Sequence, residues 1–254
     1  MDQTIENTAG RAAAVESPQP RRRADWPRAW RALRAIIDDP DRTDKVIEFI
    51  NSVGGTADVQ AMARLQAHPD GRRLLAEKPS LLDALADLPG LAALPEGTLG
   101  RAYADFMRGE ALSPDGIVME FRNAETTQAP TSEDQLWFFE RFDTMHDLFH
   151  VLTGYGRDEA GEAANLAFTF AQFPARGVGF LVLAAVVIGP KDLTLAWPRY
   201  LLRAWRRGRR ATWLPLARYE ELLARPIAEV RRQLGIEAPD VAHPGGVLVS
   251  QRAL

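Results

Sequence analysis

The stretch HDLFHVLTGYGRDEAGE, residues 146–162, predicts two helices joined by a tight turn. Gly154 and Gly156 end the first helix, because glycine readily adopts the left-handed conformation found at helix C-termini. The second helix then begins near Arg157. The stretch therefore predicts a helical hairpin that carries polar side chains on both arms.

The first arm extends back to about Gln135 and carries a stripe of acidic and imidazole side chains. Asp143, His146, Asp147 and His150 stand at i, i+3, i+4 and i+7, within an arc of roughly 100°. Apolar side chains cover most of the remaining circumference, which is typical of a buried helix. Buried carboxylates and imidazoles need partners, so the stripe is not expected to face bulk water alone.

In an antiparallel hairpin, His150 and Glu162 lie at matching depth, each roughly 6–7 Å from the turn. Two imidazoles four residues apart, His146 and His150, and a facing carboxylate form a donor set suited to a divalent metal. Asp147 is either a direct ligand or an acceptor that orients a histidine. Asp143 has the same ambiguity, and we favour a place outside the ligands. The alternative is a solvated turn whose acidic residues only cap helices.

The composition limits the classes of protein that the chain can belong to. Its 254 residues, 46% hydrophobic and 26% charged, are typical of a soluble globular protein with a sizeable core. The net charge of -3 argues against general nucleic-acid binding, which needs clustered positive charge. The absence of cysteine excludes disulfides, thiolate metal sites and cysteine nucleophiles, so a metal must have nitrogen and oxygen ligands.

The chain as a whole predicts a mostly α, single-domain helical bundle, with the metal site on the helix–turn–helix hairpin. Residues 1–23 are expected to form a disordered N-terminal tail without a secretory signal. Residues 24–240 form the helical domain, and residues 241–254 form a C-terminal tail. The best strand candidate is GIVMEFR, residues 116–122.

Two apolar patterns outside the hairpin predict further helices. Trp26, Trp30, Leu33 and Ile37 recur at a spacing that places them on one helix face. The longest apolar run, VGFLVLAAVVI at residues 178–188, has eleven residues, fewer than the roughly 20 needed to span a bilayer. The longer segment NLAFTFAQFPARGVGFLVLAAVVIGP, residues 165–190, could line a channel for a lipid tail, but a buried core helix is the favoured interpretation.

The segment AWPRYLLRAWRRGRR, residues 196–210, predicts an amphipathic helix with aromatic and basic faces. Such a helix suits the surface of an anionic membrane. The alternative is an ordinary surface helix whose arginines extend over the core. The predicted membrane-binding residues are Trp197, Arg199, Arg203, Trp205, Arg206 and Arg210.

The hairpin resembles the metal motif of the coenzyme Q (ubiquinone) biosynthesis protein 4 family. The motif is His146-Asp147-x-x-His150, followed after eleven residues by Glu162. The resemblance extends over roughly residues 24–239. It includes, in the family's order, the segments HPDGRRLLAEKPSL, LPEGTLGRAYADFM, SPDG and IGP, and the tail from AWRRGRR to RRQLGI.

This resemblance implies a divalent metal, commonly zinc, at His146, Asp147, His150 and Glu162. It implies a ubiquinone-biosynthesis enzyme that performs C1 oxidative decarboxylation of a polyprenylated 4-hydroxybenzoate-derived intermediate at a membrane surface. The alternatives are a non-catalytic lipid-binding scaffold that organises the biosynthetic enzymes, or a related decarboxylase or hydroxylase of another aromatic or isoprenoid pathway. Fe²⁺ or Mn²⁺ would make the oxidation easier to explain, because zinc has no redox chemistry.

The expected partners are a polyprenylated aromatic quinone precursor, an anionic membrane surface and other ubiquinone-biosynthesis enzymes. A homo-oligomer is also expected, and nucleic acid is not. The basic residues are almost all arginine, which indicates a GC-rich genome. Since no transit peptide is apparent, we expect a peripheral protein on the cytoplasmic face of a bacterial inner membrane.

Overall fold

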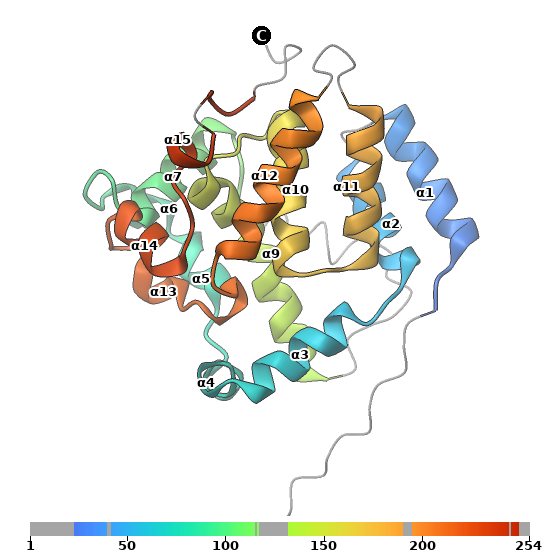
Figure 1. Ribbon diagram of the computed structural model, residues 1–254. Coiled ribbons are helices and arrows are strands. Elements are labelled where there is room, and N and C mark those ends of the chain that lie inside the picture. Colours follow the sequence, from blue (N-terminus) through green and yellow to red (C-terminus); the bar gives the residue numbers. More distant parts are fainter. Residues whose placement is uncertain are drawn as a thin grey trace, which may run out of the picture.

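The computed structural model is mostly helical, as the sequence predicted (Figure 1). It contains no strand among the residues that it describes, only an isolated bridge between Thr98 and Pro226. The described residues are 23–39, 42–114, 116, 132–189, 195–243 and 245–248. Apart from Gly116, the strand candidate lies outside them, as does the predicted N-terminal tail before residue 23.

The helices are short, apart from a central group that carries the hairpin. In chain order they are α1 (Trp26–Asp38), α2 (Thr43–Val53), α3 (Ala57–Ala67), α4 (Pro69–Glu77), α5 (Leu81–Ala86), α6 (Leu88–Ala92), α7 (Leu99–Gly109), α9 (Glu133–Thr153), α10 (Glu159–Gln172), α11 (Arg176–Ile188), α12 (Ala196–Arg210), the 3₁₀ turn η2 (Leu214–Leu216), α13 (Tyr219–Leu222), α14 (Ile227–Leu234) and α15 (Pro239–Ala242).

Helix α10 lies at the centre of the molecule, with α9 and α12 packed against it and α11 beside it (Figure 1). Small residues permit the close approach of α12. A Cβ atom on Gly208 would lie only 2.6 Å from the carbonyl oxygen of Phe168. On the α10 side, Ala164 and Ala167 are fully buried in the main core. The main core therefore surrounds α10 and holds the first turn of that helix, where Glu162 stands.

A buried arginine connects α12 to the hairpin turn. Arg207 donates hydrogen bonds to the carbonyl oxygens of Thr153 (2.6 Å) and Glu237 (2.8 Å). Its guanidinium also lies over the ring of Tyr155, 5.3 Å from the centroid. Arg207 thus satisfies a carbonyl at the C-terminal end of α9, where a helix leaves such groups without intrahelical partners.

The packed structure continues past residue 240. Helix α15 crosses that position, and His243 is buried. Pro239 also covers the hairpin turn, since a Cβ on Gly154 would meet its ring at 2.5 Å. His243, which lies beyond the predicted domain boundary at residue 240, also packs against the turn through the ring of Tyr155.

Helix α11 is not the buried core helix that its composition favoured. Val178 and Leu181 are buried, but Phe180, Leu183 and Val187 are exposed. The helix packs against α10 and α2, and its outward side is left uncovered by the residues that the structure describes. In that part of the chain, no helix has the length and apolar character to span a bilayer.

Replacing Arg207 with Met should destabilise the protein, because two buried carbonyl groups lose their donors. We expect a loss of about 2–4 kcal/mol in the free energy of unfolding, measured by urea denaturation. Arg206→Met, on the exposed side of the same helix, is the matched control and should change stability by less than about 0.5 kcal/mol. Equal effects of the two substitutions would contradict the role of Arg207.

Candidate metal centre

The hairpin is built by caps at both sides of its turn. Helix α9 is capped at its C-terminal end by Gly154, whose φ of 75° is left-handed and whose N–H donates to the carbonyl of His150. Helix α10 is capped at its N-terminal end by Asp158, whose carboxylate accepts from the N–H groups of Ala160 and Gly161. The turn therefore spans only a few residues, and the last turn of α9 faces the first turn of α10.

A close backbone contact fixes the register of the two arms. A Cβ atom on Gly161 would lie 2.0 Å from the carbonyl oxygen of Gly156, so no larger residue fits there without a backbone shift. Gly161 immediately precedes Glu162 in the sequence. As a result, Glu162 reaches the level of His150, as the depth argument predicted.

The side chains of His146, His150 and Glu162 converge. Their potential ligand atoms all lie within 4.8 Å of one another. The Nε2 atoms of the two histidines are 3.2 Å apart. Glu162 Oε2 lies 3.8 Å from Nε2 of His146 and 3.5 Å from Nε2 of His150. Two nitrogens bound to one tetrahedral zinc lie roughly 3.3 Å apart, so the spacing fits such an ion. The side chains of His146 and Glu162 are 28% and 32% exposed, which leaves one side of the group open.

The tautomer of His150 is set by the turn. Its Nδ1 lies 3.0 Å from the carbonyl oxygen of Tyr155. A carbonyl oxygen only accepts, so in the neutral ring Nδ1 carries the hydrogen and the Nε2 lone pair faces the cluster. The ring of Phe106 stacks on this imidazole with centroids 5.7 Å apart. Metal-binding histidines in proteins are commonly oriented by such a bond on the other ring nitrogen.

The electrostatics of the cluster suit cation binding. Burial, with a smaller effect of His150, lowers the pKa of His146 to about 4, so this imidazole is neutral near pH 7. Burial would raise the pKa of Glu162, but its hydrogen bond with His150 and nearby positive charge lower it to about 2. The pKa of His150 is raised, because the contact with Glu162 outweighs the effect of burial. The cluster thus offers an ionised carboxylate and one neutral imidazole to a cation.

Asp147, the fourth predicted ligand, is not part of this converging group. It is buried, and its charge contributes to raising the pKa of His150. Burial, together with this charge, also raises the pKa of Tyr103. Asp143 lies one turn earlier, where burial and the charge of Glu140 raise its pKa well above its ordinary value. The structure therefore gathers three of the four predicted ligands and leaves the role of Asp147 a prediction.

Several residues beside the cluster were not identified from the sequence motif. Arg157 Nε lies 3.5 Å from Glu162 Oε1 and places a cation at the open side. Asn165, one turn after Glu162, is fully buried, and its side-chain amide has no hydrogen-bond partner in the described part of the chain. Helical spacing from Glu162 could have indicated Asn165. No sequence signal connects Phe106 to His150, which is more than forty positions away.

The C-terminal region supports the turn through a buried hydrogen bond. The hydroxyl of Tyr155 lies 2.8 Å from Nε2 of His243. Burial, with the charges of Arg207 and Arg203 and against an opposing effect of Glu237, lowers the pKa of His243 to about 4. The same tyrosine provides the carbonyl that orients His150, so His243 acts on the cluster through Tyr155.

The predicted membrane helix has only its basic half at the surface. Trp197 is 4% exposed and donates its indole N–H to the carbonyl of Ala185, and Trp205 is half-buried. The prediction that Trp197 contacts a membrane is therefore wrong for this packing, because its face of α12 lies against the core. The four predicted arginines, Arg199, Arg203, Arg206 and Arg210, are exposed, and the last three line a cleft of about 320 Å³.

The fold and this cluster define a helical protein with a candidate histidine–carboxylate metal centre. A family model described as "Coenzyme Q (ubiquinone) biosynthesis protein Coq4" matches residues 28–240. The chain belongs to this family, which takes part in ubiquinone biosynthesis.

Named relatives agree with the family. The chain is 31% identical over 207 residues to "Ubiquinone biosynthesis protein coq-4, mitochondrial" of Neurospora crassa, covering 80% of this chain and 57% of that protein. It is 28% identical to the Podospora anserina COQ4 protein, covering 80% of this chain and 65% of that one. A crystal structure titled as that of a "Putative ubiquinone biosynthesis protein" from Nostoc punctiforme shares the fold, with a TM-score of 0.61 and 22% identity. The match covers 85% of this chain and 100% of that one.

The chain spans less than two thirds of the length of these two fungal relatives. Both are named mitochondrial proteins, as is the COQ4 protein of Talaromyces stipitatus. The expected location on the cytoplasmic face of a bacterial inner membrane is therefore wrong by this comparison. That expectation depended on arginine usage and on the lack of an apparent transit peptide, and neither of these determines a compartment.

Gly161→Ala tests the backbone contact that sets the register. The added methyl group would meet the Gly156 carbonyl, so we expect a loss of about 2–4 kcal/mol in the free energy of unfolding. Metal affinity should also fall at least about tenfold, because Glu162 moves with the backbone. Gly109→Ala is the control, since its Cβ would meet nothing within 4 Å. A Gly161→Ala protein with unaltered stability and metal affinity would disprove the constraint.

The lowered pKa of His243 predicts a loss of stability in acid. Below the usual pKa of histidine, near 6.5, the unfolded chain takes up a proton at this residue, whereas the folded protein does so only near pH 4. As the pH falls from about 6.5 to about 4, this residue alone should therefore lower the free energy of unfolding by on the order of 2 kcal/mol. Urea denaturation across this range should show a shallower pH dependence for His243→Gln. An unchanged dependence would contradict the burial of a neutral imidazole.

Proposed function

We propose that this protein is a metal-dependent enzyme of ubiquinone biosynthesis that acts on a polyprenylated 4-hydroxybenzoate-derived ring. It replaces the C1 carboxyl group with a hydroxyl group. The observation that carries the proposal is the convergence of His146, His150 and Glu162 in a chain of the Coq4 family. Zinc is the proposed ion on family resemblance, with Fe²⁺ and Mn²⁺ as alternatives, since nitrogen and oxygen ligands suit all three.

The reaction breaks the bond from C1 to the carboxyl carbon and forms a bond from C1 to oxygen. Carbon dioxide leaves, and the ring loses two electrons. With dioxygen as the electron acceptor, the acid, one water and one dioxygen give the phenol, carbon dioxide and hydrogen peroxide. A bound divalent cation would supply Lewis acidity toward a carboxylate or phenolate oxygen.

The residues of the chain prepare the site for such a substrate. His146, His150 and Glu162 would hold the ion, and Asp147 is proposed as a fourth ligand or as an acceptor near His150. Tyr155 fixes the His150 tautomer, while Phe106 covers one face of its ring. The guanidinium of Arg157, at the open side, would attract the carboxylate of the substrate.

The proposed partners follow from the substrate. A polyprenyl tail is insoluble in water, so the substrate resides in a bilayer, and the exposed arginines of α12 suit an anionic membrane surface. Other ubiquinone-biosynthesis enzymes and a second copy of the chain are further proposed partners. A second candidate function, a non-catalytic lipid-binding scaffold, is favoured by the exposed apolar side chains of α11.

Metal analysis followed by turnover assays tests the proposal. Protein purified anaerobically should contain about one divalent ion per chain, by elemental analysis. His150→Ala and Glu162→Ala should lower metal affinity more than about 100-fold, because each removes a direct ligand. His68→Asn is the control, since this exposed histidine lies between α3 and α4 and is not one of the three converging residues. Protein loaded with zinc, iron or manganese should release carbon dioxide from a prenylated hydroxybenzoate.

Two outcomes decide between the enzyme and the scaffold. Absence of turnover with every metal, in a protein that binds the ion stoichiometrically, would contradict the enzymatic role. If His150→Ala lost the metal but restored quinone synthesis in a deletion strain, the metal would be dispensable and the scaffold would be favoured.

A further inference from the structure

Helices α1, α11 and α12 leave large apolar side chains uncovered. Of the eleven exposed large hydrophobic residues in the described part of the chain, nine lie on α1, on α11, or on or just before α12. We refer to these nine as the α1–α11–α12 surface. They are Trp26, Trp30, Ile37, Phe180, Leu183, Val187, Ile188, Leu195 and Leu202.

Helix α11 contributes a continuous stripe to this surface. Phe180, Leu183 and Val187 stand at i, i+3 and i+7 and therefore point to one side of the helix. Val187 is 74% exposed. An exposed apolar patch on a soluble domain commonly marks a site of protein or membrane contact.

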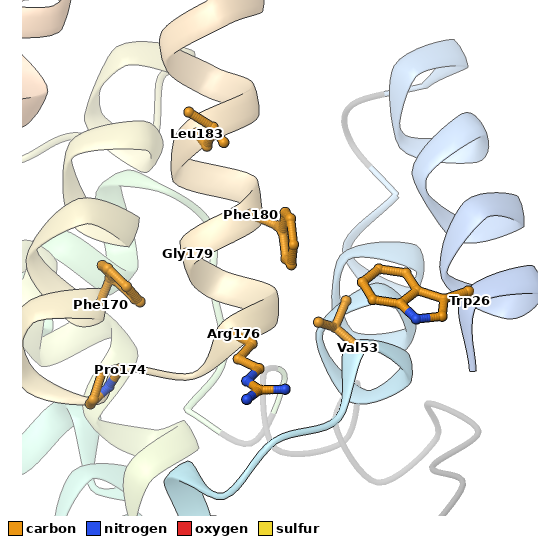
Figure 2. A pocket seen from close by; sticks show the side chains of 8 residues that line it. All are labelled: Trp26, Val53, Phe170, Pro174, Arg176, Gly179, Phe180 and Leu183. Atoms are coloured by element: carbon orange, nitrogen blue, oxygen red, sulfur yellow. The ribbon is translucent and has the colours of Figure 1, made fainter. Parts of the chain in front are cut away.

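A groove of about 470 Å³ runs beside this stripe between α11 and α1. Figure 2 shows Phe180 and Trp26 facing each other across it, and their rings meet edge to face with centroids 6.0 Å apart. Arg176 lines the same groove. The apolar side chains of α1 and α11 thus belong to one surface.

The charge of these three helices differs from that of the chain. Together α1, α11 and α12 contain ten arginines and a single acidic residue, Asp38, although the net charge of the whole chain is -3. Arg199, Arg203 and Arg206 are exposed, and none of them pairs with a carboxylate in the described part of the chain. Arg207 is buried, and Arg28 and Arg210 pair with Glu48 and Glu237, but the three helices that carry the exposed apolar side chains still have an excess of positive charge.

We propose that the α1–α11–α12 surface docks on an anionic phospholipid bilayer. The apolar side chains of α1 and α11 would enter the region of the acyl chains, while the arginines of α12 contact lipid phosphates. A second copy of the chain is a poorer partner for this surface, because a two-fold interface would bring two arginine-rich faces together. This surface replaces the aromatic face of α12, which lies in the core.

The docked orientation brings the metal centre toward the lipid. The end of α11 and the start of α12 are joined by the hydrogen bond from Trp197 to Ala185 (2.8 Å). In Figure 1, these two ends and the first turn of α10, which holds Glu162, lie at the same end of the molecule. The value of placing the metal centre near the bilayer rests on the proposed membrane-borne substrate. Docking of the surface itself does not depend on metal binding.

Vesicle flotation with the full chain tests the proposal. The protein should bind vesicles of phosphatidylcholine mixed with phosphatidylglycerol, and bind pure phosphatidylcholine at least about tenfold more weakly. Leu183→Gln combined with Val187→Gln should weaken binding to the mixed vesicles at least about tenfold, because it removes apolar surface without changing charge. Leu136→Gln, an exposed leucine on α9, is the control and should bind as the unmodified protein does.

A second pair of variants tests the arginines. Arg203→Gln combined with Arg206→Gln should weaken binding to mixed vesicles at least about tenfold. The exposed pair Arg108→Gln and Arg232→Gln makes the same charge change elsewhere and should have a smaller effect. Circular dichroism and metal content should be unchanged in all four variants, so that a loss of binding reports on the surface and not on the fold or the metal centre.

Three results would overturn the proposal. The first is unaltered vesicle binding of the Leu183/Val187 variant, and the second is equal binding of the unmodified protein to both vesicle types. The third is a dimer in sedimentation velocity that the Leu183/Val187 substitutions convert to a monomer, together with no vesicle binding. That third result would assign the surface to a second copy of the chain.

Discussion

The backbone contact between Gly156 and Gly161 is the constraint on which the candidate site depends. It sets the distance between α9 and α10 and thereby the level at which Glu162 meets His150. The core around α10 holds the second arm in place, and Pro239 covers the turn from outside. The convergence of His146, His150 and Glu162 is thus a consequence of how closely the two helices approach each other at the turn.

The turn also prepares the chemistry of the histidines. The carbonyl of Tyr155 gives His150 the tautomer with a free Nε2, and burial keeps His146 neutral. Tyr155 is in turn held by His243 and lies under Arg207, which satisfies the end of α9. Elements that are distant in sequence, α12 and the segment after α15, therefore stabilise the orientation of the candidate ligands.

Local pattern was enough to predict the helices, the hairpin and the convergence of His146, His150 and Glu162, because helical periodicity and glycine position act over a few residues. Long-range packing was not predictable in this way. The burial of Trp197, the contact of Phe106 with His150 and the extension of packing to His243 all depend on which helix lies against which. The exposure of α11 was missed for the same reason, since an apolar run is equally compatible with a core or with a membrane-facing surface.

We propose that His146, His150 and Glu162 bind one divalent ion directly. X-ray absorption spectroscopy of the metal-loaded protein tests it most directly. We expect a first coordination shell of nitrogen and oxygen, with scattering from two imidazole rings in the unmodified protein and from one in His150→Ala. A shell of water oxygens alone, or two imidazoles in both proteins, would contradict it.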